Sequence, residues 1–187
     1  MVAHLLTGVR LLLVVPAAFA FAGWPPLGDV LPALLVAVAI ATDYYDGVLA
    51  RVLGTASPAG RLFDHTTDFL FVTSGLFGAA ATGAVTWVLP TLIVFAFAQY
   101  VLDSYLLHRE KQLRMSRLGR WNGVLYFAPL VIIALARLPV PRGIAGTLLG
   151  LAAITAWALA LSTVASIVDR ALATRTSPST GAASTGP

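Results

Sequence analysis

The chain of 187 residues contains no cysteine, which excludes disulfide bonds and thiolate metal sites. It is also poor in charge, since 11% of its residues are charged, whereas soluble domains carry about 25%. Hydrophobic residues make up 58% of the chain, and the mean hydropathy is +0.86. This composition excludes an ordinary soluble domain and indicates a single membrane domain.

Long apolar segments are abundant, and about 20 such residues are enough to cross the hydrocarbon core of a bilayer. Six segments qualify: 5–23, 29–50, 61–82, 86–107, 122–138 and 144–168. Turn residues separate three pairs of them: Pro25-Pro26, Thr82-Gly83 and Pro139-Val140-Pro141. We therefore predict an all-α polytopic membrane protein, with a bundle of six transmembrane helices in residues 1–171 and a disordered polar tail in residues 172–187.

Basic residues are distributed unevenly between the two ends of these segments. The side of the termini and of the 2–3 and 4–5 loops holds ten of the twelve: Arg10, Arg51, Arg61, Arg109, Lys111, Arg114, Arg117, Arg120, Arg170 and Arg175. Arg137 and Arg142 fall on the other side. The positive-inside rule then places both termini in the cytoplasm and the chain in the cell membrane. These loops account for the net charge of +4 without a nucleic-acid partner.

The first segment has an alternative interpretation as a secretory signal peptide, because Ala18-Phe19-Ala20 resembles a cleavage site. However, the residues before the apolar run are nearly uncharged, and Arg10 interrupts the run. Cleavage would also leave five spans and reduce the charge asymmetry. We therefore expect this segment to be retained as a transmembrane helix.

Acidic residues are scarce, and half of them gather in one stretch. Four of the eight lie within 26 positions: Asp43, Asp46, Asp64 and Asp68. Carboxylates at membrane depth are costly, so they are taken as functional by default. In helices the first pair is spaced i, i+3 and the second i, i+4, so each pair shares a helix face. Because the connection between the two helices is short, we expect the four carboxylates to converge at the cytoplasmic membrane surface.

Four carboxylates in one place repel one another unless some are protonated or a cation lies among them. Oxygen ligands suit magnesium, manganese or calcium rather than zinc. Carboxylates around two such ions are a recurring arrangement in phosphoryl chemistry. The small residues Gly47, Ala50 and Gly60 leave room for a bulky ligand. The guanidinium of Arg51 is suited to phosphate oxygens.

The complete pattern has eight fixed residues: Asp43, Asp46, Gly47, Ala50, Arg51, Gly60, Asp64 and Asp68. At every fixed position and gap it resembles the signature of the CDP-alcohol phosphotransferase family, Asp-x2-Asp-Gly-x2-Ala-Arg-x8-Gly-x3-Asp-x3-Asp. The motif covers 26 residues, and the six-span layout extends the likeness over most of residues 5–170. The resemblance implies a homodimeric membrane enzyme of phospholipid biosynthesis, also called a CDP-alcohol phosphatidyltransferase.

The resemblance also implies the roles of these residues. Divalent metals, Mg2+ or Mn2+ in a two-metal site, would be held by Asp43, Asp46, Asp64 and Asp68. Asp68 would also be the catalytic general base for the acceptor alcohol. The cytidine diphosphate site would be lined by Gly47, Ala50, Arg51 and Gly60. The implied reaction is transfer of a phosphatidyl group from CDP-diacylglycerol to an alcohol, with release of CMP. Such a transfer depends mainly on positioning and charge neutralisation.

Thr7 and Arg10 resemble the end of a family stretch, Pro-Asn-x2-Thr-x2-Arg, in which Ala3 and His4 here replace Pro and Asn. Arg10 needs a carboxylate partner, and both a structural role and a substrate-phosphate role are open for it. Asp103 is the intramembrane acid outside the motif. We expect it to pair with Arg10 or another interior arginine rather than to contact substrate.

The stretch from Arg109 to Asn122 is basic, which suits anionic lipid and the predicted topology. The alternative interpretation is a specific functional role, in which Arg117 and Arg120 bind a phosphorylated acceptor. Gly119-Arg120-Trp121-Asn122 resembles the Gly-Lys-x-Lys-Thr stretch of phosphatidylglycerophosphate synthases, with Asn122 in place of the second Lys. Glycerol 3-phosphate is therefore the first acceptor that we expect, followed by inositol phosphate or another alcohol.

A divalent-cation transporter is the alternative from a different functional class, because it also needs an acidic site. It would require polar residues that continue to the far side of the membrane, whereas 30–40 and 70–81 carry no charge. A transporter also has no evident need for Arg51 beside its cation. We therefore predict a transferase with an active site open to the cytoplasmic side.

Overall fold

The computed structural model describes residues 2–24, 28–52, 58–102 and 117–173, and the regular structure in these ranges is entirely helical. Eight helices follow one another there: α1 (Val2–Leu12), α2 (Val14–Phe21), α3 (Leu31–Val52), α4 (Pro58–Ala81), α5 (Val88–Leu102), α6 (Arg117–Leu125), α7 (Phe127–Arg137) and α8 (Arg142–Ala173). The predicted all-α class is confirmed for the described part of the chain.

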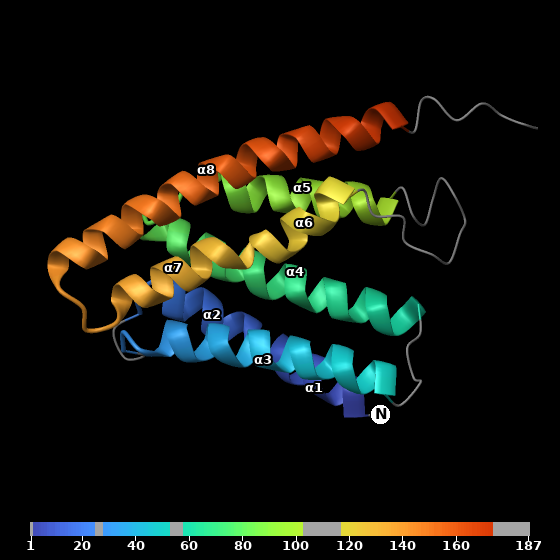
Figure 1. Cartoon of the computed structure of the whole chain (residues 1–187), viewed down its shortest axis with the longest axis horizontal. Helices are drawn as coiled ribbons and strands as arrows, with labels where there is room; N and C mark the ends of the chain where they lie inside the picture. The colour runs from blue at the N-terminus through green and yellow to red at the C-terminus, as the bar shows by residue number, and fades with distance from the viewer. Residues whose placement is uncertain (1, 25–27, 53–57, 103–116, 174–187) are drawn as a thin grey trace, which may run out of the picture.

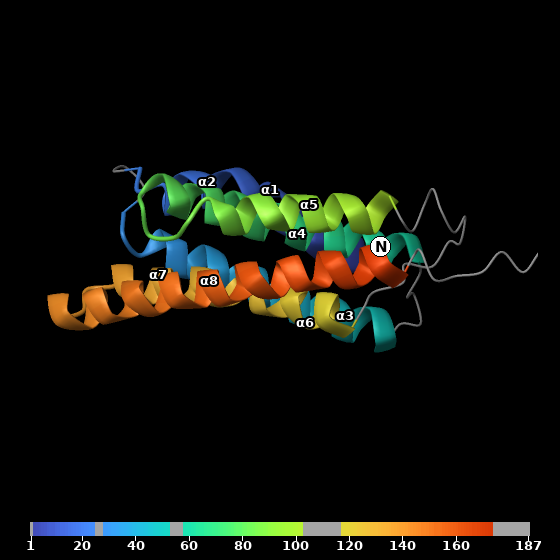
Figure 2. The ribbon, with the colours of Figure 1, turned by 90° about the horizontal axis from the view of Figure 1, so that it is seen from above.

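The helices run roughly along the long axis of the molecule (Figure 1). Seen from above, α1, α2, α4 and α5 form one layer, and α3, α6, α7 and α8 form the other (Figure 2). Helix α2 packs on α4 and α7 packs on α8, while α1 lies against both α3 and α4. The start of α1 and the end of α8 lie at the same end of the bundle (Figure 1). This agrees with the predicted alternation of the segments, and which side of the membrane that end faces stays a prediction.

Three helical stretches are long and apolar enough to cross a membrane: Leu31–Leu49, Leu118–Arg137 and Arg142–Leu172. Two others, Leu6–Phe21 and Val88–Leu102, are apolar but shorter. Helix α4 has 24 residues, but its first part contains the second half of the acidic motif, with Asp64 and Asp68, and is therefore less apolar. These helices indicate a membrane protein, and the six spans expected from the sequence stay a prediction.

The segment expected at 5–23 is two helices, because it breaks at Leu13, three residues before Pro16. Proline lacks the backbone N–H, and its ring clashes with the carbonyl four residues earlier. Beside the break, the Ser74 hydroxyl of α4 donates a hydrogen bond to the Val14 carbonyl at 3.0 Å. This hydrogen bond ties α4 to the backbone of α2 directly after the break.

The segment expected at 122–138 starts earlier and breaks at Tyr126, three residues before Pro129. The same proline effect explains this break. At the break, the Tyr126 hydroxyl lies 2.7 Å from the Thr163 hydroxyl of α8, and the two form a hydrogen bond. Polar pairs of this kind join helices within membranes.

Helix α2 approaches α4 closely because glycine lies at their contact. A Cβ atom added at Gly78 would lie 2.3 Å from the carbonyl oxygen of Ala18. One at Gly75 would lie 3.4 Å from the side chain of Phe21 of α2 and 3.1 Å from that of Leu130 of α7. Small residues allow helix backbones to approach each other in this way. The α2–α4 contact therefore fixes how the first two helices sit on α4.

The turn predicted at Thr82-Gly83 is present, and Gly83 has a φ of 77°, which glycine adopts without strain. The Pro25-Pro26 turn, the polar tail from Thr174 and most of the basic stretch lie outside the described residues. Those predictions stay untested.

Candidate active site

Helices α3 and α4 carry the acidic motif and turn one face each toward a common cavity. On α3 the cavity-lining residues are Ile40, Asp43, Tyr44 and Gly47. On α4 they are Asp64, His65, Asp68, Phe69 and Val72. The α3 set follows the i, i+3, i+4, i+7 spacing of a single helix face, as do His65, Asp68, Phe69 and Val72 on α4, and Asp64 lies one turn before Asp68. The helical period therefore explains why residues so far apart in sequence meet.

Arg10 of α1 lies between these two helices and pairs with three of the four motif aspartates. Its side chain is completely buried, with 0% exposure. The Nη1 atom donates hydrogen bonds to Oδ1 of Asp64, at 3.0 Å, and to Oδ1 of Asp68. The Nη2 atom lies 3.4 Å from Oδ1 of Asp43. A single buried cation thus connects the acids of both helices.

Asp46 is placed differently from the other three aspartates. It is buried and does not line the cavity, and its Oδ2 accepts a hydrogen bond from the Thr7 hydroxyl of α1. Thr7 and Arg10 are spaced i, i+3, so they share a face of α1. The expected convergence of carboxylates therefore holds for three of them, and the fourth is held by the same helix one turn earlier.

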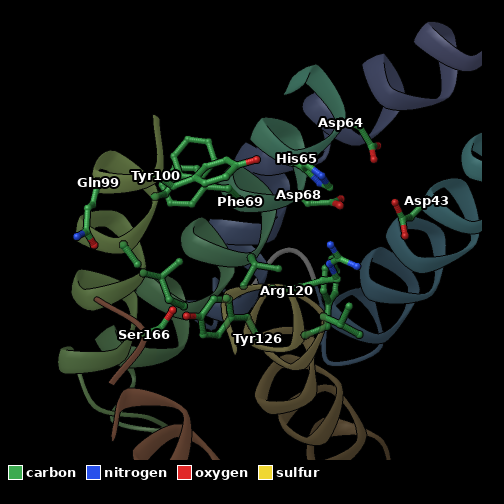
Figure 3. Close-up of a pocket in the computed structure, with 18 of the residues that line it drawn as sticks. Asp43, Asp64, His65, Asp68, Phe69, Gln99, Tyr100, Arg120, Tyr126 and Ser166 are labelled. Atoms are coloured by element: carbon green, nitrogen blue, oxygen red, sulfur yellow. The ribbon is translucent and has the colours of Figure 1, made fainter. Parts of the chain in front are cut away.

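A cavity of about 720 Å3 opens beside the acids and is lined by α3 to α8. Asp43, Asp64 and Asp68 point toward one another at one side, with Arg120 beside them (Figure 3). Gln99 and Ser166 lie on the far side (Figure 3). Most of the other walls are apolar or aromatic: Val72, Ile93, Ala96, Phe97, Val124, Phe127 and Ile167. A charged side joined to apolar walls suits an amphiphilic ligand.

Two arginines among the described residues line this cavity. Arg120 comes from α6, and Arg170 comes from the last turn of α8. The guanidinium carbon of Arg170 lies 5.1 Å from the ring centroid of Tyr100, which is a cation–π contact. The cavity therefore offers positive charge as well as carboxylates.

The acidic side of the cavity fits a hard divalent cation. Ligand atoms of Asp64, His65 and Asp68 all lie within 4.8 Å of one another. Carboxylate oxygens are the ligands that Mg2+ and Mn2+ prefer in proteins. Arg10 brings one positive charge to three carboxylates, so negative charge is left for a metal ion to balance.

The residues predicted to bind cytidine diphosphate are described to different extents. Gly47 lines the cavity, and Gly60 lies in the first turn of α4. Ala50 and Arg51 lie near the end of α3, where the structure describes the backbone only.

The two predicted acceptor residues also differ. Arg120 lines the cavity, whereas Arg117 begins α6 with only its backbone described. Asp103 lies outside the described residues, so its pairing stays a prediction. Within the described residues, Arg10 pairs with the motif aspartates instead.

Three cavity residues were not predicted as site residues from the sequence: His65, Tyr126 and Arg170. His65 occupies a variable position of the motif, although its i−3 spacing from Asp68 places it on the same helix face. Arg170 contributes to the topology count, and only the packing of α8 brings it to the cavity. From the sequence, Tyr126 is an aromatic residue near a predicted helix end, as is typical of the membrane interface. The structure places it at the break between α6 and α7, where it lines the cavity.

Comparisons with known proteins agree with this geometry. A family model for CDP-alcohol phosphatidyltransferases matches residues 1–171, which include the motif aspartates, Arg10 and every cavity-lining residue. Comparisons with curated proteins and with solved structures give no match. Members of the family are phosphotransferases for substituted phosphate groups and are generally dependent on divalent metals. The chain therefore belongs to the CDP-alcohol phosphatidyltransferase family.

Proposed function

We propose that this protein transfers the phosphatidyl group of CDP-diacylglycerol to a phosphorylated alcohol, with glycerol 3-phosphate as first choice, and releases CMP. The observation that carries the proposal is the single cavity in which Asp43, Asp64 and Asp68 adjoin apolar walls. CDP-diacylglycerol combines a charged diphosphate with acyl chains, so it needs both kinds of surface. The family supports transfer from a CDP-alcohol donor.

The motif residues divide between metal and nucleotide. We assign one or two divalent cations, Mg2+ or Mn2+, to Asp43, Asp46, Asp64 and Asp68. When bound, the metal would neutralise charge on the diphosphate. We assign the cytidine diphosphate to Gly47, Ala50, Arg51 and Gly60.

Asp68 is the residue that we assign as general base. Arg10 engages its Oδ1 atom, so Oδ2 is the atom assigned to the proton of the acceptor hydroxyl. The hydroxyl oxygen forms a bond to the phosphorus that carries the diacylglycerol. The bond from that phosphorus to the bridging oxygen of CMP breaks, and CMP leaves with the electron pair. The Asp68 carboxylate gains the proton of the hydroxyl.

The cavity arginines support a phosphorylated acceptor. Arg120 and Arg170 offer guanidinium groups, which suit phosphate oxygens. A neutral alcohol such as inositol would leave this charge unused. We therefore place glycerol 3-phosphate and inositol phosphate ahead of inositol and serine, and we add Arg117 to Arg120 as an acceptor residue.

The family resemblance and the charge distribution support the setting of the enzyme. We propose a homodimer in the cell membrane, with six spans, cytoplasmic termini, and the cavity open to the cytoplasmic side. Residues 172–187 form a tail beyond the catalytic domain in this proposal.

The test is CMP release by the purified protein in detergent, with CDP-diacylglycerol and either Mg2+ or Mn2+. Separate tubes contain glycerol 3-phosphate, inositol phosphate, inositol, serine or phosphatidylglycerol, and the Asp68→Asn variant is the control. Release with one phosphorylated acceptor, absent in the control, is the expected result. Folded protein that binds no CDP and releases no CMP would contradict the proposal and favour a cation transporter.

A further inference from the structure

Helix α1 contacts all four motif aspartates, although none of them lies on it. Arg10 pairs with Asp43, Asp64 and Asp68, and Thr7 donates a hydrogen bond to Asp46. We infer that Thr7 and Arg10 are the positioning residues of the catalytic site, which set the directions of the four carboxylates before a cation binds. The inference rests on the proposed function.

The burial of Arg10 decides between its two roles left open by the sequence. Its side chain is fully buried and is not among the cavity-lining residues, so a substrate phosphate in the cavity does not meet it. Its partners, Asp43, Asp64 and Asp68, do line the cavity. Arg10 therefore acts on the reaction through the carboxylates, as a second layer behind them.

The fork of the guanidinium matches this task. Nη1 bonds Asp64 and Asp68 on α4, while Nη2 faces Asp43 on α3. A planar guanidinium holds its two nitrogens at a fixed separation, so it also fixes the separation of the carboxylates. In each of the three pairs Arg10 contacts the Oδ1 atom, and in our proposal the second oxygen of each carboxylate serves the cation.

Thr7 performs the same task for Asp46 without adding charge. Its hydroxyl orients the buried carboxylate and leaves its negative charge in place. One guanidinium and one hydroxyl of α1 therefore hold four carboxylates, so the acids outnumber the positive charge that α1 brings to them. A divalent cation among the carboxylates would balance more of their charge.

The packing of α2 on α4 limits the movement of the preceding helix α1, which carries Thr7 and Arg10. The backbone of α2 lies directly on Gly78 of α4, where a Cβ atom would meet the Ala18 carbonyl oxygen at 2.3 Å. Ser74 of α4 is bonded to the Val14 carbonyl at the start of α2. Both contacts hold α2 on α4, and only Leu13 separates α2 from α1, so they limit how far α1 and its Arg10 can move relative to α4.

The test compares Thr7→Val, which keeps the shape but lacks the hydroxyl, with Thr7→Ser, which keeps the hydroxyl. The affinity for Mn2+ is measured on chelator-stripped protein by the resonance signal of free Mn2+, with kcat, KM and thermal unfolding alongside. Residues that orient metal ligands typically contribute about 10–100-fold in metal affinity. We expect a loss of that size in Thr7→Val, with an unchanged melting temperature and recovery in Thr7→Ser.

Thr73→Val is the matched control. Thr73 is also buried, lies on α4, and has a hydroxyl without a hydrogen-bond partner in the described residues. Its replacement should leave Mn2+ affinity and kcat unchanged. Equal Mn2+ affinities in Thr7→Val and Thr73→Val would overturn the role of Thr7.

Arg10→Lys is the second, independent variant. Lysine keeps the charge but has one nitrogen, so it cannot contact α3 and α4 in the same way. A folded Arg10→Lys protein with wild-type Mn2+ affinity and kcat would overturn the role of Arg10. If the wild-type protein itself neither binds Mn2+ nor releases CMP, the proposed function fails and the inference fails with it.

Discussion

Two arginines hold opposite ends of the bundle, and their partners differ in kind. Arg10 is paired with three carboxylates of α3 and α4. Arg137, the last residue of α7, donates hydrogen bonds to the backbone carbonyls of Ala20 and Phe21 and lies 5.9 Å from the Phe21 ring centroid. Both satisfy the requirement that a cation within a membrane protein has partners.

The two arginines differ in the charge of the groups that surround them. The carbonyls at the end of α2 carry partial negative charge that a cation satisfies. Arg137 therefore joins the end of α7 to the end of α2 through neutral carbonyl groups rather than carboxylates. Arg10 meets three carboxylates, and in our proposal these acids also bind a cation. The two arginines would then differ in role, with Arg137 serving stability and Arg10 serving the reaction as well.

Arg10→Met should have the largest effect. It removes the cation from three carboxylates, and loss of one partner from a buried ionic cluster costs about 3–5 kcal/mol. We expect a lower melting temperature together with loss of CMP release. Both are measured in detergent, with activity normalised to folded protein. Wild-type activity per folded molecule would show that Arg10 and Arg137 are equivalent.

Gly78→Ala should have the next largest effect, because the new methyl group meets backbone rather than a movable side chain. Overpacking of this kind costs about 1–3 kcal/mol. Thermal unfolding gives the loss of stability. Gly146→Ala is the control, since nothing lies within 4 Å of a Cβ atom at that position of α8. Equal melting temperatures for the two variants would contradict the close α2–α4 contact.

Arg137→Met should destabilise the fold while sparing the chemistry. It removes the side-chain donor of the Phe21 carbonyl and one of the donors to the Ala20 carbonyl, which keeps the Gly23 N–H, and a lost partner costs about 1–3 kcal/mol. We expect a lower melting temperature, but the wild-type kcat and Mn2+ affinity per folded molecule. A selective fall in kcat would contradict the division of roles between the two ends.

Arg120→Gln should have the smallest effect and should be confined to the acceptor. Loss of one charged hydrogen bond of about 1.5 kcal/mol would raise the acceptor KM about tenfold. The KM for CDP-diacylglycerol should not change. Steady-state kinetics with each substrate varied in turn separates the two constants. An equal rise in both would remove Arg120 from the acceptor site.

The spacing of the motif was sufficient to predict that Asp43, Asp64 and Asp68 share one site, because helical period fixes which residues face the same way. The same reasoning did not predict the separate contact of Asp46. That contact depends on how α1 packs between α3 and α4, which periodicity within one helix does not contain. The partners of Arg10 could not be chosen from sequence for the same reason.

The breaks at Leu13 and Tyr126 show a different limit. Pro16 and Pro129 are visible in the sequence, but proline within an apolar segment is compatible with either a kink or a helix end. Neighbouring groups decide the outcome, and at the first break these include Ser74. Arg170 is a further case, since only the packing of α8 brings it beside the cavity.

The most direct test of the central claim, that the aspartates facing Arg10 form a cation-dependent transfer site, is CMP release as a function of added Mn2+. The protein is first stripped with a chelator and then given CDP-diacylglycerol and glycerol 3-phosphate. We predict no release without metal, saturable recovery in the wild-type protein, and no recovery in folded Asp64→Asn. Full release in the presence of chelator, or wild-type recovery in Asp64→Asn, would contradict the account.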